Sequence, residues 1–399
     1  MRRVLLVLGT RPEIIKLGPL YRELAHRGEF EVETYSSGQH VELAKGLMDL
    51  FGIEVTYCGD NLLARVGLLQ KLSQMIAELG EIITRKNYTW LIVQGDTMTA
   101  TAGSIAGFLN RVPVAHVEAG LRTWNLDAPW PEEFSRRVIT LSATAHFCPT
   151  QEAKENLLRE GVDPSHATVT GNTVVDALQY VRNLIRFDYV PQSDQVRRIP
   201  TDKKLILVTG HRRENFGKPL KDIVGALRKL AADGDKSIVF PVHLNPDVKR
   251  AVYTELSGTA NIYLIDPVCY PDFVYLMERA WTIVTDSGGI QEEAPTFHRP
   301  IVVTRVSTER PEAVNAGFVT LVGSDAGRLV RRVRELTSGT SPVMIKGDNP
   351  FGKGDAAKRI ASSLRSWNDT IGVRIRNNRR SGSATSLQTG YQGSISPAE

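Results

Sequence analysis

The 399-residue chain lacks several features that would place it in a special class of protein. It has no apolar run near the roughly 18 residues that a membrane span requires. Its three cysteines, Cys58, Cys148 and Cys269, lie far apart without CxxC spacing, which argues against a disulfide framework or a zinc site and favours a reducing cytoplasm. Aromatic residues make up only 7%, too few for the base-stacking surface of a nucleic-acid binder.

A large excess of charge of one sign is also absent. The chain has 49 basic and 44 acidic residues, a net charge of +5. More than half of this excess comes from the stretch that begins at Arg374, which holds four arginines and one glutamate. This stretch is rich in Ser and Gly and predicts a disordered tail over 374–399. We therefore expect neither a nucleic-acid nor a membrane partner.

Short apolar runs alternate with longer helical patterns. The runs predict strands buried on both sheet faces, at Val4–Leu8, Leu91–Val93, Val112–Val117, Leu205–Val208, Ile238–Val242, Trp281–Thr285 and Ile301–Val303. The helical patterns cover Lys16–Arg27, Ala64–Arg85, Pro131–Thr144, Lys218–Asp233 and Glu312–Ala316. The first run follows two arginines but is too short for the apolar part of a signal peptide. The alternation predicts an α/β protein with mostly parallel sheets.

A polar stretch at Tyr189–Pro200 separates two sets of strands. We predict two doubly wound domains, 1–172 and 173–354, with a helix at about 355–368 that packs back on the first domain. Ligands of open α/β sheets bind beyond the carboxyl ends of the strands. The predicted site is therefore the cleft between the domains.

Two polar motifs follow strands of the first domain. Arg11 and Lys16 flank a helix start that contains Pro12, and they predict a diphosphate site; a solvated pair of Glu13 with Lys16 is the alternative. Asp96 follows the predicted strand Leu91–Val93. In this position its carboxylate is suited either to a catalytic role or to capping the next helix.

Two further carboxylates belong to the same domain. Glu118 ends an apolar run, where a carboxylate is costly unless it faces a cleft or is paired, for example with Arg122. Glu132 shares a helix face with Arg136 four residues later, so a surface ion pair is the alternative to a functional role.

The second domain contributes cations and glycines at strand ends. His211 and Arg212 follow a strand and would face the cleft, although a lone histidine is often structural. The Ser287-Gly288-Gly289 turn would let backbone N–H groups approach an anion, and a plain turn is the alternative.

Anion-binding elements on both domains and three carboxylates on one domain predict an enzyme that acts on a nucleotide-diphosphate compound by acid/base chemistry. Either Glu292 or Glu293 is suited to accept hydrogen bonds from ribose hydroxyls. No metal-ligand spacing and no catalytic serine or cysteine setting stands out in the sequence.

Nine motifs in order resemble the non-hydrolysing UDP-N-acetylglucosamine 2-epimerases. They run from about residue 3 to about residue 365 and read GTRPEIIK, VQGDT, HVEAGLRT, PWPEE, TGNTVVDAL, TGHRREN, VHLNP, DSGGIQEEAP and TERPEAV. The resemblance implies a GT-B-like pair of Rossmann-like domains, a homodimer and no added cofactor. It also implies anti elimination of UDP from UDP-GlcNAc to a 2-acetamidoglucal, followed by syn addition that gives UDP-ManNAc.

The resemblance also implies roles for individual residues. The acid/base carboxylates would be Asp96, Glu118 and Glu132, with His211 assisting at the diphosphate and in proton transfer. The phosphates or the sugar would be held by Arg11, Lys16, Arg136, Ser287 and Gly288. Glu293 would bind the ribose, Phe273 would lie near the uracil, and Arg212, His243 and Gly289 complete the predicted UDP-binding set.

One region departs from the family pattern. Gly38-Gln39-His40 is present, but Glu42 follows it, and Tyr57–Lys71 offers no counterpart to the family's effector-binding arginine. This argues against an allosteric UDP-GlcNAc site. The alternatives are a modified substrate such as UDP-2,3-diacetamido-glucuronate, a hydrolysing relative that releases ManNAc and UDP, a glycosyltransferase, and a non-catalytic nucleotide-sugar sensor.

Overall fold

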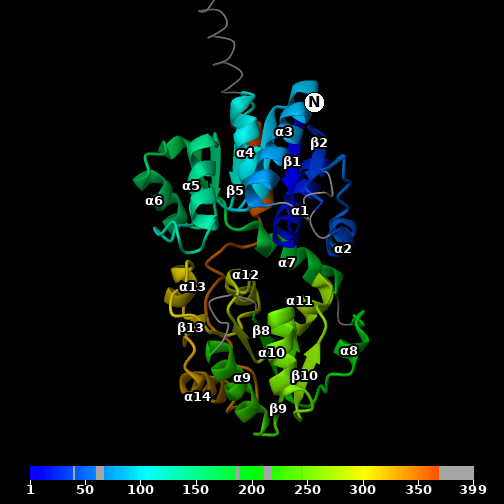
Figure 1. Cartoon of the computed structure of the whole chain (residues 1–399), viewed down its shortest axis with the longest axis vertical. Helices are drawn as coiled ribbons and strands as arrows, with labels where there is room; N and C mark the ends of the chain where they lie inside the picture. The colour runs from blue at the N-terminus through cyan, green and yellow to red at the C-terminus, as the bar shows by residue number, and fades with distance from the viewer. Residues whose placement is uncertain (39–40, 60–66, 186–187, 211–217, 244, 368–399) are drawn as a thin grey trace, which may run out of the picture.

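The computed structural model describes residues 1–38, 41–59, 67–185, 188–210, 218–243 and 245–367. These residues form two parallel β-sheets, each flanked by helices, which follow one another along the long axis of the molecule (Figure 1). The predicted α/β class with two Rossmann-like domains in a GT-B-like arrangement is thereby confirmed. The predicted tail lies outside the described residues.

The first sheet has seven parallel strands in the order β3-β2-β1-β4-β5-β6-β7. The strands are β1 Arg2–Leu8, β2 Phe30–Ser36, β3 Tyr57–Cys58, β4 Trp90–Gln94, β5 Val114–Val117, β6 Ala145–Cys148 and β7 Ala167–Val169. The helices are α1 Arg11–His26, α2 Val41–Phe51, α3 Leu68–Arg85, α4 Met98–Leu109, α5 Glu132–Ser142, α6 Gln151–Arg159 and α7 Thr173–Leu184, with a 3₁₀ turn at Pro164–His166.

The second sheet has six parallel strands in the order β10-β9-β8-β11-β12-β13. The strands are β8 Lys204–Thr209, β9 Lys236–Pro241, β10 Ile262–Ile265, β11 Thr282–Thr285, β12 Ile301–Val303 and β13 Val319–Leu321. The helices are α8 Asp194–Arg197, α9 Lys218–Ala231, α10 Pro246–Leu256, α11 Tyr270–Arg279, α12 Gly288–Glu293, α13 Pro311–Asn315 and α14 Ala326–Leu336, with a 3₁₀ turn at Ala294–Phe297.

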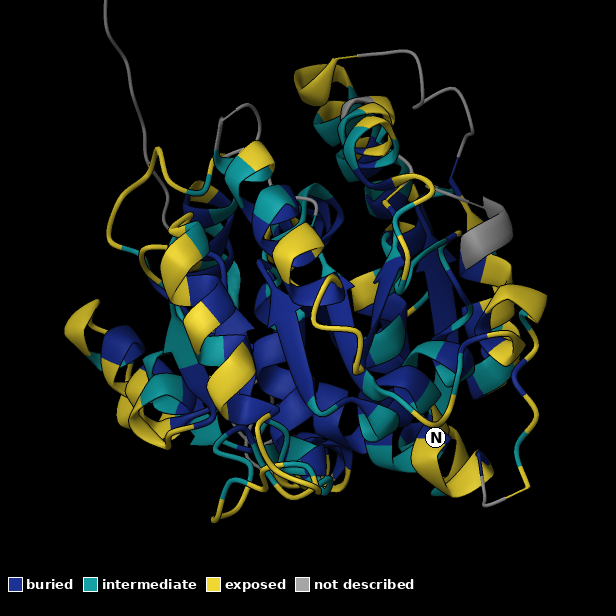
Figure 2. Ribbon diagram, turned by 90° about the horizontal axis from the view of Figure 1, so that it is seen from below, coloured by how far each residue is buried: buried dark blue, intermediate teal, exposed yellow. Residues whose placement is uncertain are grey.

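The central strands are buried on both faces, as their uninterrupted apolar sequences predict. Val4–Leu8 and Leu91–Val93 are fully buried. Figure 2 shows the buried ribbon concentrated in the strands and the exposed positions on the outer faces of the helices. Each of the seven predicted strands overlaps a strand of the structure. Burying both sheet faces in this way fixes the strand ends as the free edge available to a ligand.

The chain crosses between the two sheets twice. It leaves the first sheet through α7 and returns at its end as a helix over 356–367. This last helix packs on the first sheet, where the ring of Trp367 lies 6.0 Å from the ring of Trp90. The domain boundary at 172/173 stays a prediction. Among the helices of the described ranges, none has both the length and the apolar character of a membrane span.

Candidate functional site

Polar residues from three neighbouring strands meet at one edge of the first sheet. Because β1, β4 and β5 are adjacent and parallel, the segments that follow them start side by side. The segment after β1 carries Arg11 and Lys16, Asp96 follows β4, and Glu118 follows β5. The strand order thus brings together the first-domain residues that the sequence placed at strand ends.

Helix α1 starts with a capping box formed by Thr10 and Glu13. The Thr10 backbone N–H donates to Glu13 Oε2 at 2.6 Å, and the Thr97 hydroxyl donates to Glu13 Oε1 at 2.6 Å. Burial raises the pKa of Glu13 to about 7, although these hydrogen bonds favour the charged form. Since both Glu13 and Lys16 are buried, a solvated pair between them is excluded. Arg11 is partly buried, and burial lowers its pKa.

Glu118 pairs with Lys16 rather than with Arg122. Lys16 Nζ lies 2.5 Å from Glu118 Oε1, and the side-chain amide of Asn172 donates to the same oxygen at 3.1 Å. The amide of Gln94 donates to Glu118 Oε2. Glu118 is 8% exposed and has a positive φ of 63°. Arg122 instead forms a two-pronged contact with Glu160, at 2.8 and 2.6 Å.

The pKa values of Lys16 and of Glu118 are both raised. Burial raises the pKa of Glu118, and the positive charge of Lys16 opposes this shift. For Lys16, burial alone would lower the pKa, but Glu118 and Glu292 outweigh it and the pKa is raised. A carboxyl with a raised pKa beside a stable cation is suited to proton transfer.

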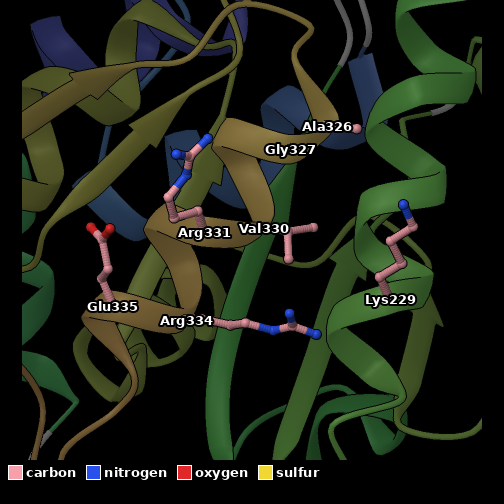
Figure 3. Close-up of a pocket in the computed structure, with 7 residues that line it drawn as sticks. All are labelled: Lys229, Ala326, Gly327, Val330, Arg331, Arg334 and Glu335. Atoms are coloured by element: carbon pink, nitrogen blue, oxygen red, sulfur yellow. The ribbon is translucent and has the colours of Figure 1, made fainter.

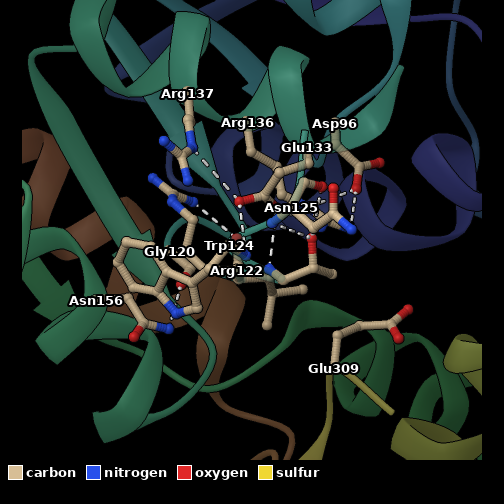
Figure 4. A network of polar contacts seen from close by, with 12 residues as sticks. Asp96, Gly120, Arg122, Trp124, Asn125, Glu133, Arg136, Arg137, Asn156 and Glu309 are labelled. Atoms are coloured by element: carbon tan, nitrogen blue, oxygen red, sulfur yellow. Dashed lines mark hydrogen bonds and ion pairs between the residues drawn. The ribbon is translucent and has the colours of Figure 1, made fainter. Parts of the chain in front are cut away.

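Asp96 is held by Arg136, as Figure 4 shows. The Nε of Arg136 donates to Asp96 Oδ2 at 2.8 Å, and its Nη1 donates to Glu133 Oε2 at 3.0 Å. Asp96 does not cap α4, because the cap is Thr97, whose side chain accepts a hydrogen bond from the Ala100 N–H. Arg136 therefore orients a carboxylate at the cleft.

Glu133, next to the predicted Glu132, is the carboxylate that organises this loop. It is fully buried and accepts hydrogen bonds from the backbone N–H groups of Thr123 and Trp124, at 3.0 and 3.2 Å (Figure 4). Arg136 thus pairs with Glu133 and Asp96 instead of forming the surface pair with Glu132. Glu132 Oε2 is buried and has no hydrogen-bond partner among the described residues, so this oxygen has unused acceptor capacity.

The turn between β11 and α12 is the part of the second domain that faces this edge of the first sheet. Ser287 is the N-cap residue of α12, and Gly288 and Gly289 form its first turn. Glu293 is buried, and its Oε1 accepts a hydrogen bond from the Tyr270 hydroxyl at 2.6 Å. Burial raises the pKa of Glu293 to about 7. Its predicted role at the ribose stays a prediction.

One ion pair connects the two domains at the site. Lys16 Nζ lies 3.3 Å from Glu292 Oε2 on α12, and Arg310 Nε donates to Glu292 Oε1 at 2.7 Å. Arg310, Glu13 and Asn172 were not among the residues predicted for the site, and Glu292 was one of two candidates for the ribose. Arg310 and Asn172 lie within the matching motifs TERPEAV and TGNTVVDAL, which was the available signal.

The remaining predicted residues are placed as follows. His211 and Arg212 lie outside the described residues. Parts of the two segments that argue against an allosteric site also lie outside them, so that expectation stays a prediction. His243 is exposed just beyond β9, and its Nδ1 accepts a hydrogen bond from the Asn245 N–H at 3.1 Å. Phe273 is partly buried on α11 against the main apolar core.

A groove of about 480 Å³ between α9 and α14 lies away from these strand ends. It is lined by Lys229, Ala326, Gly327, Val330, Arg331, Arg334 and Glu335 (Figure 3). Arg334 is paired there with Asp233 at 2.8 Å. None of the predicted site residues lines this groove, and the candidate site remains the edge between the two sheets.

Two Rossmann-like domains that bring the ends of their strands together around buried carboxylates define an enzyme of the GT-B-like architecture. A family model described as UDP-N-acetylglucosamine 2-epimerase matches residues 22–365. The UDP-N-acetylglucosamine 2-epimerase of Escherichia coli K12 is 44% identical over 374 residues, covering 91% of this chain and 98% of the relative. The chain belongs to the UDP-N-acetylglucosamine 2-epimerase family, as its motifs predict, and is an enzyme of the epimerase class.

Solved structures agree with this assignment. The UDP-GlcNAc 2-epimerase from Neisseria meningitidis bound to UDP-GlcNAc is 38% identical with a TM-score of 0.86, and the match covers 91% of this chain and all of that one. The enzyme from Methanocaldococcus jannaschii in complex with UDP-GlcNAc and UDP is 32% identical with a TM-score of 0.78, covering 91% and 99%.

Proposed function

We propose that this enzyme interconverts UDP-GlcNAc and UDP-ManNAc without releasing the sugar. The observation that carries the proposal is the group of carboxylates at one strand edge of the first domain, beside the Lys16–Glu292 contact with the second domain. The family relatives with bound UDP-GlcNAc support a UDP-sugar as the substrate.

In the proposed reaction, a carboxylate removes the C2 proton while the C1–O bond to UDP breaks, which leaves a 2-acetamidoglucal and UDP. UDP then adds again at C1, and a proton is delivered to the opposite face of C2. No net oxidation occurs, and the proton removed is replaced. Asp96, Glu118 and Glu132 are the proposed acid/base groups. Their electrostatic settings differ, because Arg136 holds Asp96, Lys16 pairs with Glu118, and one oxygen of Glu132 has no hydrogen-bond partner among the described residues.

In this proposal, the cations and the glycine turn bind the diphosphate. We propose that Arg11, Arg136, Ser287, Gly288 and Gly289 stabilise the departing diphosphate, with His211, Arg212 and His243, and that Lys16 lies at the sugar-diphosphate junction. The C2–H bond of a sugar is barely acidic, so stabilising the leaving group in a closed, dry site is needed for elimination.

The test is incubation with UDP-GlcNAc in deuterated water, followed by NMR of the products. We expect UDP-ManNAc with deuterium at C2 and little free sugar. Free ManNAc as the main product would overturn the non-hydrolysing assignment. Deuterium exchange only with UDP-2,3-diacetamido-glucuronate would assign the enzyme to the modified sugar instead.

We further propose a cytoplasmic homodimer. All three cysteines are free, which fits a reducing compartment. The neighbouring helices α4 and α5 expose large apolar side chains, including Phe108, Leu109 and Leu141 at 60%, 68% and 85%. Exposed apolar side chains on two neighbouring helices are typical of a subunit contact.

A further inference from the structure

Asp96 lies in a short turn between β4 and α4, and its neighbours on both sides are held in place. Gly95, before it, has a φ of 69°, and its N–H donates to the Val117 carbonyl oxygen at 2.9 Å. Thr97, after it, is the N-cap residue of α4, and its hydroxyl donates to Glu13 Oε1 at 2.6 Å. The peptide group that joins Gly95 to Asp96 is therefore the part of this turn whose orientation remains to be fixed.

A buried imidazole from β5 holds this peptide group. His116 is 1% exposed, and its Nε2 lies 2.7 Å from the Gly95 carbonyl oxygen. Because a carbonyl oxygen only accepts hydrogen bonds, Nε2 carries the proton and donates it. Glycine has no Cβ to restrict its ψ, so without this hydrogen bond the carbonyl group could turn away at little cost. The hydrogen bond thus fixes the direction in which the chain enters Asp96.

Packing alone does not account for a histidine at this position. Its Nδ1 is buried and has no hydrogen-bond partner among the described residues, which is costly for a polar atom. Burial lowers the pKa of His116 to about 4; the hydrogen bond to Gly95 and the charge of Asp96 oppose this shift, while Arg122 and Arg136 add to it. The ring is therefore neutral near pH 7, with its single N–H directed at the Gly95 carbonyl oxygen.

We propose that His116 is a positioning residue, which holds the Gly95 carbonyl group and thereby sets where the Asp96 carboxylate lies against the substrate. Arg136 holds the carboxylate itself, through its Nε at 2.8 Å, so the backbone and the side chain of Asp96 are fixed by different residues. His116 does not need to touch the substrate, because it acts through Gly95. The catalytic part of this inference rests on the proposed function.

The experiment compares His116→Gln with His116→Asn in kcat and KM for C2 deuteration of UDP-GlcNAc. The amide nitrogen of Gln is as far from Cβ in bonds as Nε2 of His, so it can reach the Gly95 carbonyl oxygen, whereas the Asn amide is too short. H116N should lower kcat at least about tenfold and change KM less than about threefold, because the loss is in the catalytic step. H116Q should keep kcat within about threefold of the wild type. Wild-type kcat in H116N, or an equal loss in both variants, would overturn the proposal.

His146→Asn is the matched control. His146 lies opposite His116 on the neighbouring strand β6, is 2% exposed, and likewise has an Nδ1 without a hydrogen-bond partner among the described residues. The substitution removes a second buried imidazole from the same sheet and leaves the bond to Gly95 in place. H146N should keep kcat within about threefold of the wild type. A loss equal to that of H116N would contradict a specific role for His116.

NMR of the histidine rings tests the hydrogen bond without relying on activity. In protein labelled with ¹⁵N-histidine, the signals of His116 are those that disappear in H116Q. They should show a neutral ring with its proton on Nε2 from about pH 6 to 9. A proton on Nδ1 would overturn the proposal, because Nε2 could then no longer donate to Gly95. If the wild type fails to deuterate UDP-GlcNAc, the proposed function fails, and the NMR result still decides whether His116 holds Gly95.

Discussion

The three proposed acid/base carboxylates have different partners, so their substitutions can be distinguished. Asp96 is held by Arg136, Glu118 by Lys16, and one oxygen of Glu132 has no hydrogen-bond partner among the described residues. We expect each amide variant to lower kcat by about 10²-fold or more, while UDP binding measured by calorimetry changes little. Glu81→Gln, in an exposed pair with Arg85, is the control. Wild-type turnover in any of the three would remove that residue from the mechanism.

Glu13 should make stability depend on pH. Its pKa is raised from about 4.5 to about 7, so the folded protein binds this proton more tightly than the unfolded chain. This contribution is complete below pH 4.5 and is lost as the pH rises through 7. Gln can bond to both Thr10 and Thr97, so Glu13→Gln should gain stability relative to wild type between pH 5 and 8, by up to about 3 kcal/mol. Urea unfolding of both proteins at pH 5 and at pH 8 measures this difference in the free energy of unfolding. A relative loss at pH 8 would show that the charged carboxylate stabilises the fold.

Sequence reasoning could predict which residues gather at the strand ends but not which of them pair. Lys16, Asp96 and Glu118 follow adjacent strands, so the parallel order is enough to bring them together. Arg136, however, lies at helical spacing from both Glu132 and Glu133, and local spacing cannot choose between them. The choice of Glu133 depends on the loop N–H groups of Thr123 and Trp124, which only the fold brings to it.

At the level of elements, the last helix depends on one buried carboxylate. Asp176 on α7 accepts hydrogen bonds from the N–H groups of Ala356 and Ala357, at 3.2 and 2.9 Å. These groups are in the first turn of the helix over 356–367, which has no partners for them within the helix. Asp176→Ala should destabilise the protein by about 1–2 kcal/mol and speed amide hydrogen exchange in 356–367. Asp348→Ala, which removes an exposed pair with Lys353 outside this helix, should not speed it. Equal exchange in both variants would contradict the capping role.

Two of the strands that sequence reasoning missed, β2 and β6, carry charged or titratable residues. β2 carries Glu31 and Glu33, and β6 carries His146, so neither shows an uninterrupted apolar run. The charge of Glu33 in β2 is compensated, because Lys86 Nζ and the Tyr88 hydroxyl, from the segment before β4, donate hydrogen bonds to its carboxylate. Such compensation comes from distant residues, so a local pattern cannot reveal it. The start of α1 was easier to predict, because Pro12 suits the first turn of a helix.

At the scale of the whole molecule, the contact between the domains was beyond sequence reasoning. The two sets of strands predicted two sheets, and the strand-end rule predicted a cleft between them. The contact of Lys16 with Glu292 depends on how closely the sheets approach, and no local pattern encodes this distance. The sequence thus predicts the parts of the site, while the closed geometry is a property of the assembled fold.

The exposed apolar ends of α4 and α5 lead to a prediction about assembly. Phe108, Leu109 and Leu141 are too exposed to stabilise the monomer, but a second copy could bury them. We expect light scattering to give twice 44.1 kDa for the wild type, and Leu141→Glu to give the monomer mass, because a buried unpaired carboxylate is costly. Val306→Glu is the matched control, since Val306 is 89% exposed on the second domain. If L141E stays dimeric while V306E dissociates, the subunit contact lies on the second domain instead.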